Sequence, residues 1–156
     1  MADRAVILLD VDGVLNPRIR PVSGELVVEV TPEVADRVRR LTALGEVVWA
    51  TTHSARVRDA LAESIGLPPS TRSVSFGTTP PRGERTLTPK RHGVDRWLER
   101  NAPDGGWHAA VWIDDALHPD VDEWAAALSH PLVPIRVDPD EGLTDAHVRA
   151  VKAALQ

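Results

Sequence analysis

The apolar run at residues 6–9, followed by Asp10-Val11-Asp12-Gly13, constrains the fold of this chain more than any other stretch. A short apolar run that ends in a turn residue is typical of a strand buried on both faces of a parallel sheet. Strand geometry places Asp10 and Asp12 on the same side of the chain where it leaves the sheet. Carboxylates at the end of a buried strand are costly unless they are compensated, and a divalent cation with oxygen ligands is the usual compensation.

Strand and helix patterns alternate along the rest of the chain. Residues 16–24 and 68–89 are rich in loop-forming residues, and the second stretch contains one expected strand. Further strands are expected at residues 25–30, 46–50, 73–76, 109–113 and 132–137. Helices are expected from Thr31 to Gly45, over Val57, Leu61 and Ile65, from Thr88 over Val94, Trp97 and Leu98, and at residues 119–128 and 144–155.

This alternation predicts an α/β fold over residues 1–156 as a single domain. The expected architecture is a three-layer, doubly wound (Rossmann-like), mostly parallel sheet with helices on both faces. Ligands of such sheets bind beyond the carboxyl ends of the strands, where the strand order reverses. The intervals after Gly13 and between Ser54 and Lys90 are too short for an independently folded unit, so no separate cap domain is expected.

Composition excludes several classes of protein. The 156 residues contain no Cys, which rules out a disulfide framework and thiolate zinc sites. No apolar run approaches the ~20 residues of a membrane span, and the first residues lack the apolar core of a signal peptide. A cytoplasmic protein without a membrane partner is therefore expected. The net charge of −5 argues against broad, nonspecific nucleic-acid binding.

Three more polar signals lie at expected strand ends or helix starts. Thr51 ends the strand at residues 46–50, and its hydroxyl and the following backbone N–H groups would suit a phosphoryl oxygen. Thr52 is the alternative if the register differs by one residue, and a turn-forming Thr is the ordinary role of such a residue. His53 beside them is either a substrate contact or a solvated loop residue.

The other two signals are a cation and a pair of acids. Lys90 begins an expected helix, where a cation is poorly placed for the helix dipole, and Arg91 is its nearest alternative. Asp114-Asp115 follow an apolar strand, and adjacent acids repel each other unless a cation or a helix terminus absorbs their charge. Without such a role, Lys90 would be a solvated surface residue and the acids would form a turn that caps the next helix.

Together these residues resemble the four motifs of the haloacid dehalogenase-like (HAD) superfamily, in family order from Asp10 to Asp115. The superfamily consists mostly of Mg-dependent phosphatases and phosphotransferases. The resemblance implies that Asp10 is the nucleophile, Asp12 the general acid and base, and Thr51 and Lys90 the groups that stabilise the phosphoryl oxygens. It also implies a Mg²⁺ site at Asp10, Asp12 and Asp115, with Asp114 bound less directly.

A narrower resemblance concerns residues 138–147 and Trp49-Ala50-Thr51-Thr52. These stretches are similar to small HAD-like domains related to RNA-repair phosphatase modules. The resemblance and the missing cap imply an open site for a large phosphorylated substrate, such as a nucleotide or a nucleic-acid end. Arginines in the two irregular stretches would line its rim: Arg18, Arg20, Arg82, Arg85 and Arg91.

Three alternatives to this function remain at the level of the sequence. A relaxed-specificity phosphatase would act on small metabolites. A non-hydrolytic module would keep the metal pocket but only bind a phosphorylated ligand. A receiver-like signalling domain is also doubly wound, but its phosphoacceptor Asp would end a later, central strand, whereas the second strand of the expected sheet ends in Thr51.

Overall fold

The computed structural model describes residues 4–77, 88–101 and 106–156. Its centre is a parallel sheet in the order β4-β1-β5-β6. These strands are β4 (Glu46–Trp49), β1 (Ala5–Leu9), β5 (Ala109–Asp114) and β6 (Leu132–Arg136). The chain starts in β1, moves to β4 on one side and then crosses to β5 on the other. The strand order therefore reverses at β1, and the predicted doubly wound α/β fold is confirmed.

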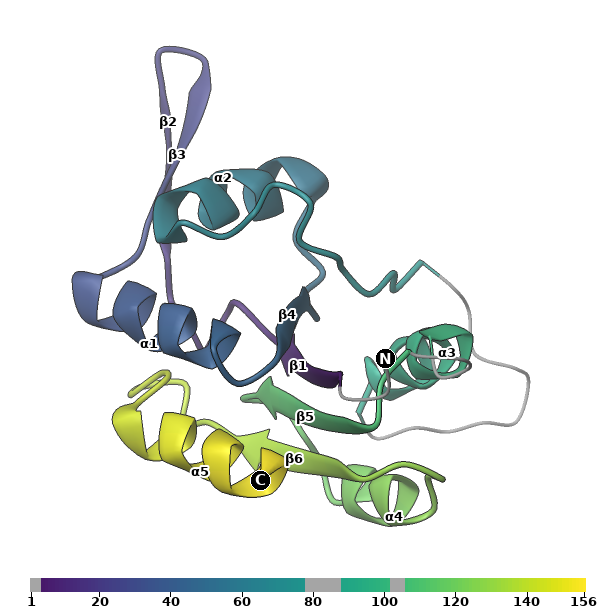
Figure 1. Cartoon of the computed structure of the whole chain (residues 1–156). Coiled ribbons are helices and arrows are strands. Elements are labelled where there is room, and N and C mark those ends of the chain that lie inside the picture. The colour runs from purple at the N-terminus through teal and green to yellow at the C-terminus, as the bar shows by residue number, and fades with distance from the viewer. Residues whose placement is uncertain (1–3, 78–87, 102–105) are drawn as a thin grey trace.

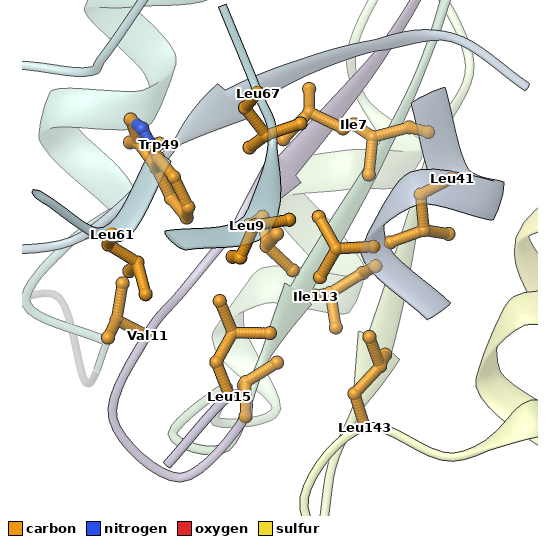
Figure 2. Packing of buried hydrophobic residues seen from close by; sticks show 14 of the residues in the cluster. Ile7, Leu9, Val11, Leu15, Leu41, Trp49, Leu61, Leu67, Ile113 and Leu143 are labelled. Atoms are coloured by element: carbon orange, nitrogen blue, oxygen red, sulfur yellow. The ribbon is translucent and has the colours of Figure 1, made fainter. Parts of the chain in front are cut away.

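Helices cover both faces of the sheet, as Figure 1 shows. Alternate residues of β1 point to opposite faces, so Ile7 and Leu9 belong to one core cluster and Val6 and Leu8 to the other. The first cluster is larger and includes Leu41, Trp49 and Leu61 (Figure 2). It lies under α1 (Pro32–Thr42), α2 (Ala55–Ile65) and α5 (Asp145–Leu155), whereas the second lies under α3 (Arg91–Asn101) and α4 (Asp120–Ala126).

Most helix boundaries follow the expected signals, but α1 ends at Thr42 rather than at Gly45, and α4 ends at Ala126 rather than at residue 128. The Thr31 hydroxyl accepts a hydrogen bond from the backbone N–H of Val34 and caps α1, and Gly66 ends α2 with φ +90°. The expected start, with Thr88 as the cap and Pro89 as the first helical residue, is wrong by two residues, because α3 begins at Arg91. The buried Thr88 hydroxyl donates to Asp120 instead of capping α3, and so connects this turn to the start of α4. None of the described helices is long and apolar enough to cross a membrane.

Residues 16–24 were expected to form a loop, and that expectation is wrong. They contain β2 (Arg18–Val22), which pairs antiparallel with β3 (Glu25–Glu29) in a hairpin that projects from the body of the molecule (Figure 1). Ser23 and Gly24 join the strands with φ of +51° and +81°. Two positive φ values in a row form the two-residue turn that matches the twist of a hairpin, and the Ser-Gly pair permits them. Between Gly13 and α1, this hairpin takes the place of a cap domain.

The strand expected at residues 73–76 is reduced to one bridge. Trp49 donates its backbone N–H to the carbonyl of Arg72 and accepts from the N–H of Val74. The segment therefore extends the sheet beyond β4 through a single parallel bridge between Trp49 and Ser73. Because β4 ends at Trp49, it has no later residues with which residues 74–76 could pair.

Candidate active site

The ends of three neighbouring strands meet at the carboxyl edge of the sheet. The Asp10 backbone N–H donates to the carbonyl of Ile113 in β5 at 3.0 Å. The Ala50 N–H, just after β4, donates to the carbonyl of Leu9 at 2.8 Å. These bonds continue the ladders beyond β1 and hold the residues that follow it beside the ends of both neighbours. The Asp10 side chain is buried there, with Thr51 and Asp114.

Lys90 brings a cation to this edge from the turn before α3. Its ammonium group donates to Asp10 Oδ1 at 2.7 Å, to the Ala50 carbonyl at 2.9 Å and to Asp114 Oδ2 at 3.0 Å. Three acceptors use all three donors of an ammonium group, so its position is well determined. Arg91, the alternative considered from the sequence, instead lies with its Nε 3.3 Å from Asp120 Oδ2.

The charges of this cluster do not balance. Burial, followed by the charge of Asp114, raises the pKa of the Asp10 carboxyl to about 7, against the opposing effect of Lys90. Burial alone would lower the pKa of Lys90, but Asp114 and Asp10 outweigh it and the pKa is raised. Two buried carboxylates thus share one ammonium group, and the excess negative charge favours a further cation.

The acidic residues at this edge fit a hard divalent cation. Asp10, Asp114 and Asp115 each offer a carboxylate oxygen, and these oxygens lie within 4.8 Å of one another. An all-oxygen set suits Mg²⁺ or Ca²⁺ rather than a softer metal. Gly13 has φ +77°, and a Cβ at this position would lie 2.2 Å from Asp115 Oδ2. A glycine is therefore needed for the loop after β1 to pass this close to Asp115.

Asp12 lies apart from these three carboxylates. Its side chain is 74% exposed, and its carboxylate oxygens lie 3.0 and 3.1 Å from His53 Nε2. Its role as a metal ligand, which the resemblance implies, remains a prediction. His53, which the sequence left between a substrate contact and a solvated residue, contacts the group that the resemblance implies as general acid and base.

The loop that carries Asp12 is supported by a residue that sequence analysis missed. Asn16 Oδ1 accepts from the Gly13 N–H at 2.8 Å, and its Nδ2 donates to the Pro139 carbonyl at 3.1 Å. Asn16 has φ +47°, a conformation that Asn tolerates better than most residues. The carbonyl of Val14 also accepts from the N–H of Leu143. The segment after β6 thus holds the loop after β1 in place, and an Asn four residues after Asp12 was the available signal.

Thr51 and Thr52 follow β4 at the same edge. The buried Thr51 hydroxyl accepts from the His53 N–H at 3.2 Å, which is the turn-forming role that the sequence also allowed. Thr52 is exposed. Their roles toward a phosphoryl group remain predictions.

The arginines that were expected at the rim of the site do not form one group among the described residues. Arg18 and Arg20 lie on the exposed β2, and Arg20 pairs with Glu29 at 3.3 Å. Arg82 and Arg85 lie outside the described residues.

The chain is similar to a known protein family and to a solved structure. A protein family described as the HAD domain in Swiss Army Knife RNA repair proteins matches residues 6–148. A solved structure from Legionella pneumophila, assigned to the subfamily III A hydrolases of the HAD superfamily, is 18% identical, with a TM-score of 0.45. That match covers 97% of this chain and 81% of the other. No curated protein matches the chain.

Proposed function

Because the chain belongs to the family of HAD domains in Swiss Army Knife RNA repair proteins, we propose that it is a Mg²⁺-dependent phosphomonoesterase. Family membership supports a HAD-type hydrolase as the general activity. The observation that carries the specific proposal is the buried contact of Lys90 with both Asp10 and Asp114, beside Asp115. A bound Mg²⁺ would neutralise their excess negative charge and that of the transferring phosphoryl group.

In the first step, a carboxylate oxygen of Asp10 attacks phosphorus and the bond to the leaving oxygen breaks. Lys90 orients Asp10 and stabilises the charge on the phosphoryl oxygens. Asp12 gives its proton to the leaving oxygen. The products are the free alcohol and an aspartyl-phosphate on Asp10, so that one difficult hydrolysis becomes two easier displacements.

In the second step, Asp12 accepts a proton from water while the water oxygen attacks phosphorus. The bond between phosphorus and Asp10 breaks, which releases phosphate and restores the Asp10 carboxylate. The contact with His53 holds Asp12 at the mouth of the site, where its exposed carboxylate can reach both a leaving alcohol and a water molecule. Thr51 and the backbone N–H groups at the start of α2 are proposed to bind the phosphoryl oxygens.

The exposure of Asp12 also favours a large substrate. An open site excludes water poorly around a small molecule, whereas a large substrate covers the site itself. The family's occurrence in RNA repair proteins makes a phosphorylated nucleic-acid end or a nucleotide the preferred class. A relaxed-specificity phosphatase of small metabolites is the competing enzyme, and a non-hydrolytic module that binds phosphorylated ligands is the competing binding function.

An assay with a generic aryl phosphate separates these functions. The wild-type protein should release phosphate with added Mg²⁺ and stop when EDTA is added. Wild-type protein that binds phosphate but releases none from any phosphomonoester would be a binding module. Specificity is tested by comparing kcat/KM for a phosphate-terminated oligonucleotide with that for small sugar phosphates at fixed low salt. A clear preference for the sugar phosphates would contradict the proposed substrate class.

A further inference from the structure

We infer that the pocket beside the carboxylate cluster binds the nucleoside next to the scissile phosphate, with the Phe76 ring as the stacking surface for its base. The inference rests on the proposed phosphatase function and specifies its substrate. The pocket measures about 340 Å³, a size suited to a small organic group. Its walls include Thr51, Thr52, His53, Arg58, Ser75 and Phe76.

Two of these walls join the pocket to the proposed reaction centre. His53 contacts Asp12, which would protonate the leaving oxygen. The Phe76 ring centroid lies 5.9 Å from Lys90 Nζ, which in turn contacts Asp10. A substrate with its phosphorus at Asp10 and its leaving oxygen near Asp12 would therefore have its next group at the mouth of this pocket.

Gly93 in α3 allows the Phe76 ring to pack directly against the helix. A Cβ at Gly93 would lie 2.6 Å from Phe76 Cδ1, closer than any side chain could remain. Gly93 is the third residue of α3, so a residue of low helix propensity lies where the ring rests against the helix. The ring is only partly buried and also lines the pocket, so it is positioned by the helix and still accessible from the pocket.

Most of the remaining walls are polar and suit a nucleoside better than an apolar group. Thr51, Thr52 and Ser75 provide hydroxyls for ribose oxygens or for the polar edge of a base. Arg58 donates one N–H to the His53 carbonyl at 2.8 Å, which anchors its guanidinium beside the pocket. An apolar leaving group would offer these polar atoms no hydrogen bonds in place of water, whereas a base stacks on one aromatic ring and forms hydrogen bonds at its edge.

The test compares two substrates that share the same leaving oxygen, adenosine 5′-monophosphate and ribose 5-phosphate. The ratio of their kcat/KM values isolates the contribution of the base. Wild-type protein should prefer the nucleotide, and Phe76→Leu should lower the preference at least about fivefold, while Phe76→Tyr should retain most of it. Gly93→Ala should also lower the ratio, because it displaces the ring although it raises the helix propensity of α3.

A matched control is Trp97→Leu. This substitution removes an aromatic ring of α3 that contacts Arg72, and it should leave the ratio of kcat/KM values unchanged. Circular dichroism of each variant checks that the fold persists. Equal kcat/KM values for the two substrates in the wild type, or a ratio unchanged by both Phe76→Leu and Gly93→Ala, would overturn the inference.

A binding measurement separates this inference from the proposed function. Calorimetry with Asp10→Asn protein, which should not turn substrate over, compares its affinities for the nucleotide and for ribose 5-phosphate. Tighter binding of the nucleotide that Phe76→Leu abolishes would support the pocket even if the protein proved not to be a phosphatase. Equal affinities would contradict the pocket, whereas a wild type that hydrolyses no phosphomonoester would contradict only the proposed function.

Discussion

Two polar clusters lie at opposite edges of the same sheet. At the carboxyl edge, Lys90 contacts Asp10 and Asp114, and the three side chains are 19%, 6% and 2% exposed. At the amino edge, Glu46 begins β4 and receives two hydrogen bonds from Arg72, whose third goes to Asn101 at 2.8 Å. Those two charged side chains are 31% and 37% exposed.

The two clusters differ in charge balance as well as in burial. The amino-edge cluster pairs one cation with one anion, and a neutral amide accepts the remaining hydrogen bond. The carboxyl-edge cluster holds two carboxylates against one ammonium group, in a drier environment and with Asp115 close by. A balanced, half-exposed pair stabilises the fold slightly, whereas a buried excess of negative charge destabilises it until a cation binds. The carboxyl-edge cluster is therefore the one that we propose to bind a cation, whereas the amino-edge cluster is balanced without one.

Replacement of Asp10 should have the largest effect. Asp10→Asn keeps the shape of the side chain but removes the attacking charge, so kcat/KM for an aryl phosphate should fall at least ten-thousandfold, or ~5.4 kcal/mol of barrier. Glu46→Gln at the amino edge should stay within about threefold of the wild type. A rate for Asp10→Asn within about tenfold of the wild type would exclude covalent catalysis by this residue.

Removal of each cluster's cation should destabilise the protein to different extents. Lys90→Met leaves two buried carboxylates without a partner, so the free energy of unfolding at pH 8 without Mg²⁺ should fall by about 3–5 kcal/mol. Arg72→Met should lose only about 1–2 kcal/mol, from an exposed ion pair and the stacking of its guanidinium on Trp97. Urea unfolding measures both, and equal losses would show that the clusters do not differ as proposed.

The raised pKa of Asp10 predicts a pH dependence of stability without Mg²⁺. The folded state holds the proton up to a pKa of about 7, whereas the ordinary pKa of an Asp carboxyl, as in an unfolded chain, is 3.8. The folded state therefore binds more protons between these values, and the free energy of unfolding should fall as the pH rises, by up to ~1.4 kcal/mol per pH unit.

Asp10→Asn removes this titration, and Lys90, whose pKa Asp10 raises, stays charged between pH 5 and 8 in the wild type. Without Mg²⁺, the difference in free energy of unfolding between the two proteins should change between pH 5 and 8. Added Mg²⁺ should make this difference smaller. A difference that stays constant with pH would mean that the Asp10 carboxyl is not perturbed by burial.

The exposed contact at the carboxyl edge should have the smallest effect. His53→Ala removes the partner of Asp12, so kcat for a substrate with a poor leaving group should fall about tenfold, while the free energy of unfolding stays within ~1 kcal/mol. His53→Gln, whose amide can still donate to Asp12, should recover part of the rate. If His53→Ala matches the wild type on poor leaving groups, the contact does not position Asp12.

Local sequence patterns predicted much of this architecture. The apolar runs before Asp10 and Asp114 and the spacing of apolar residues in α1 and α5 predicted the alternation of strands and helices. The hairpin was missed because Pro21 and the Arg-rich β2 conceal its strand pattern, and its register depends on the turn at Ser23 and Gly24. The late start of α3 was missed because Thr88 bonds to Asp120, a partner 32 residues away.

Local sequence patterns are sufficient to predict which residues lie at the carboxyl edge, because the periodicities of strands and helices are local properties. These patterns place Asp10, Thr51 and Asp114 at strand ends, and parallel strands bring such ends together. Which side chains meet depends on tertiary packing: Lys90 lies between Asp10 and Asp114, His53 contacts Asp12, and Phe76 packs against Gly93. Each of these contacts joins segments that are far apart in the sequence or lie outside regular helices and strands. The geometry of each contact depends on how the segments pack rather than on any local preference.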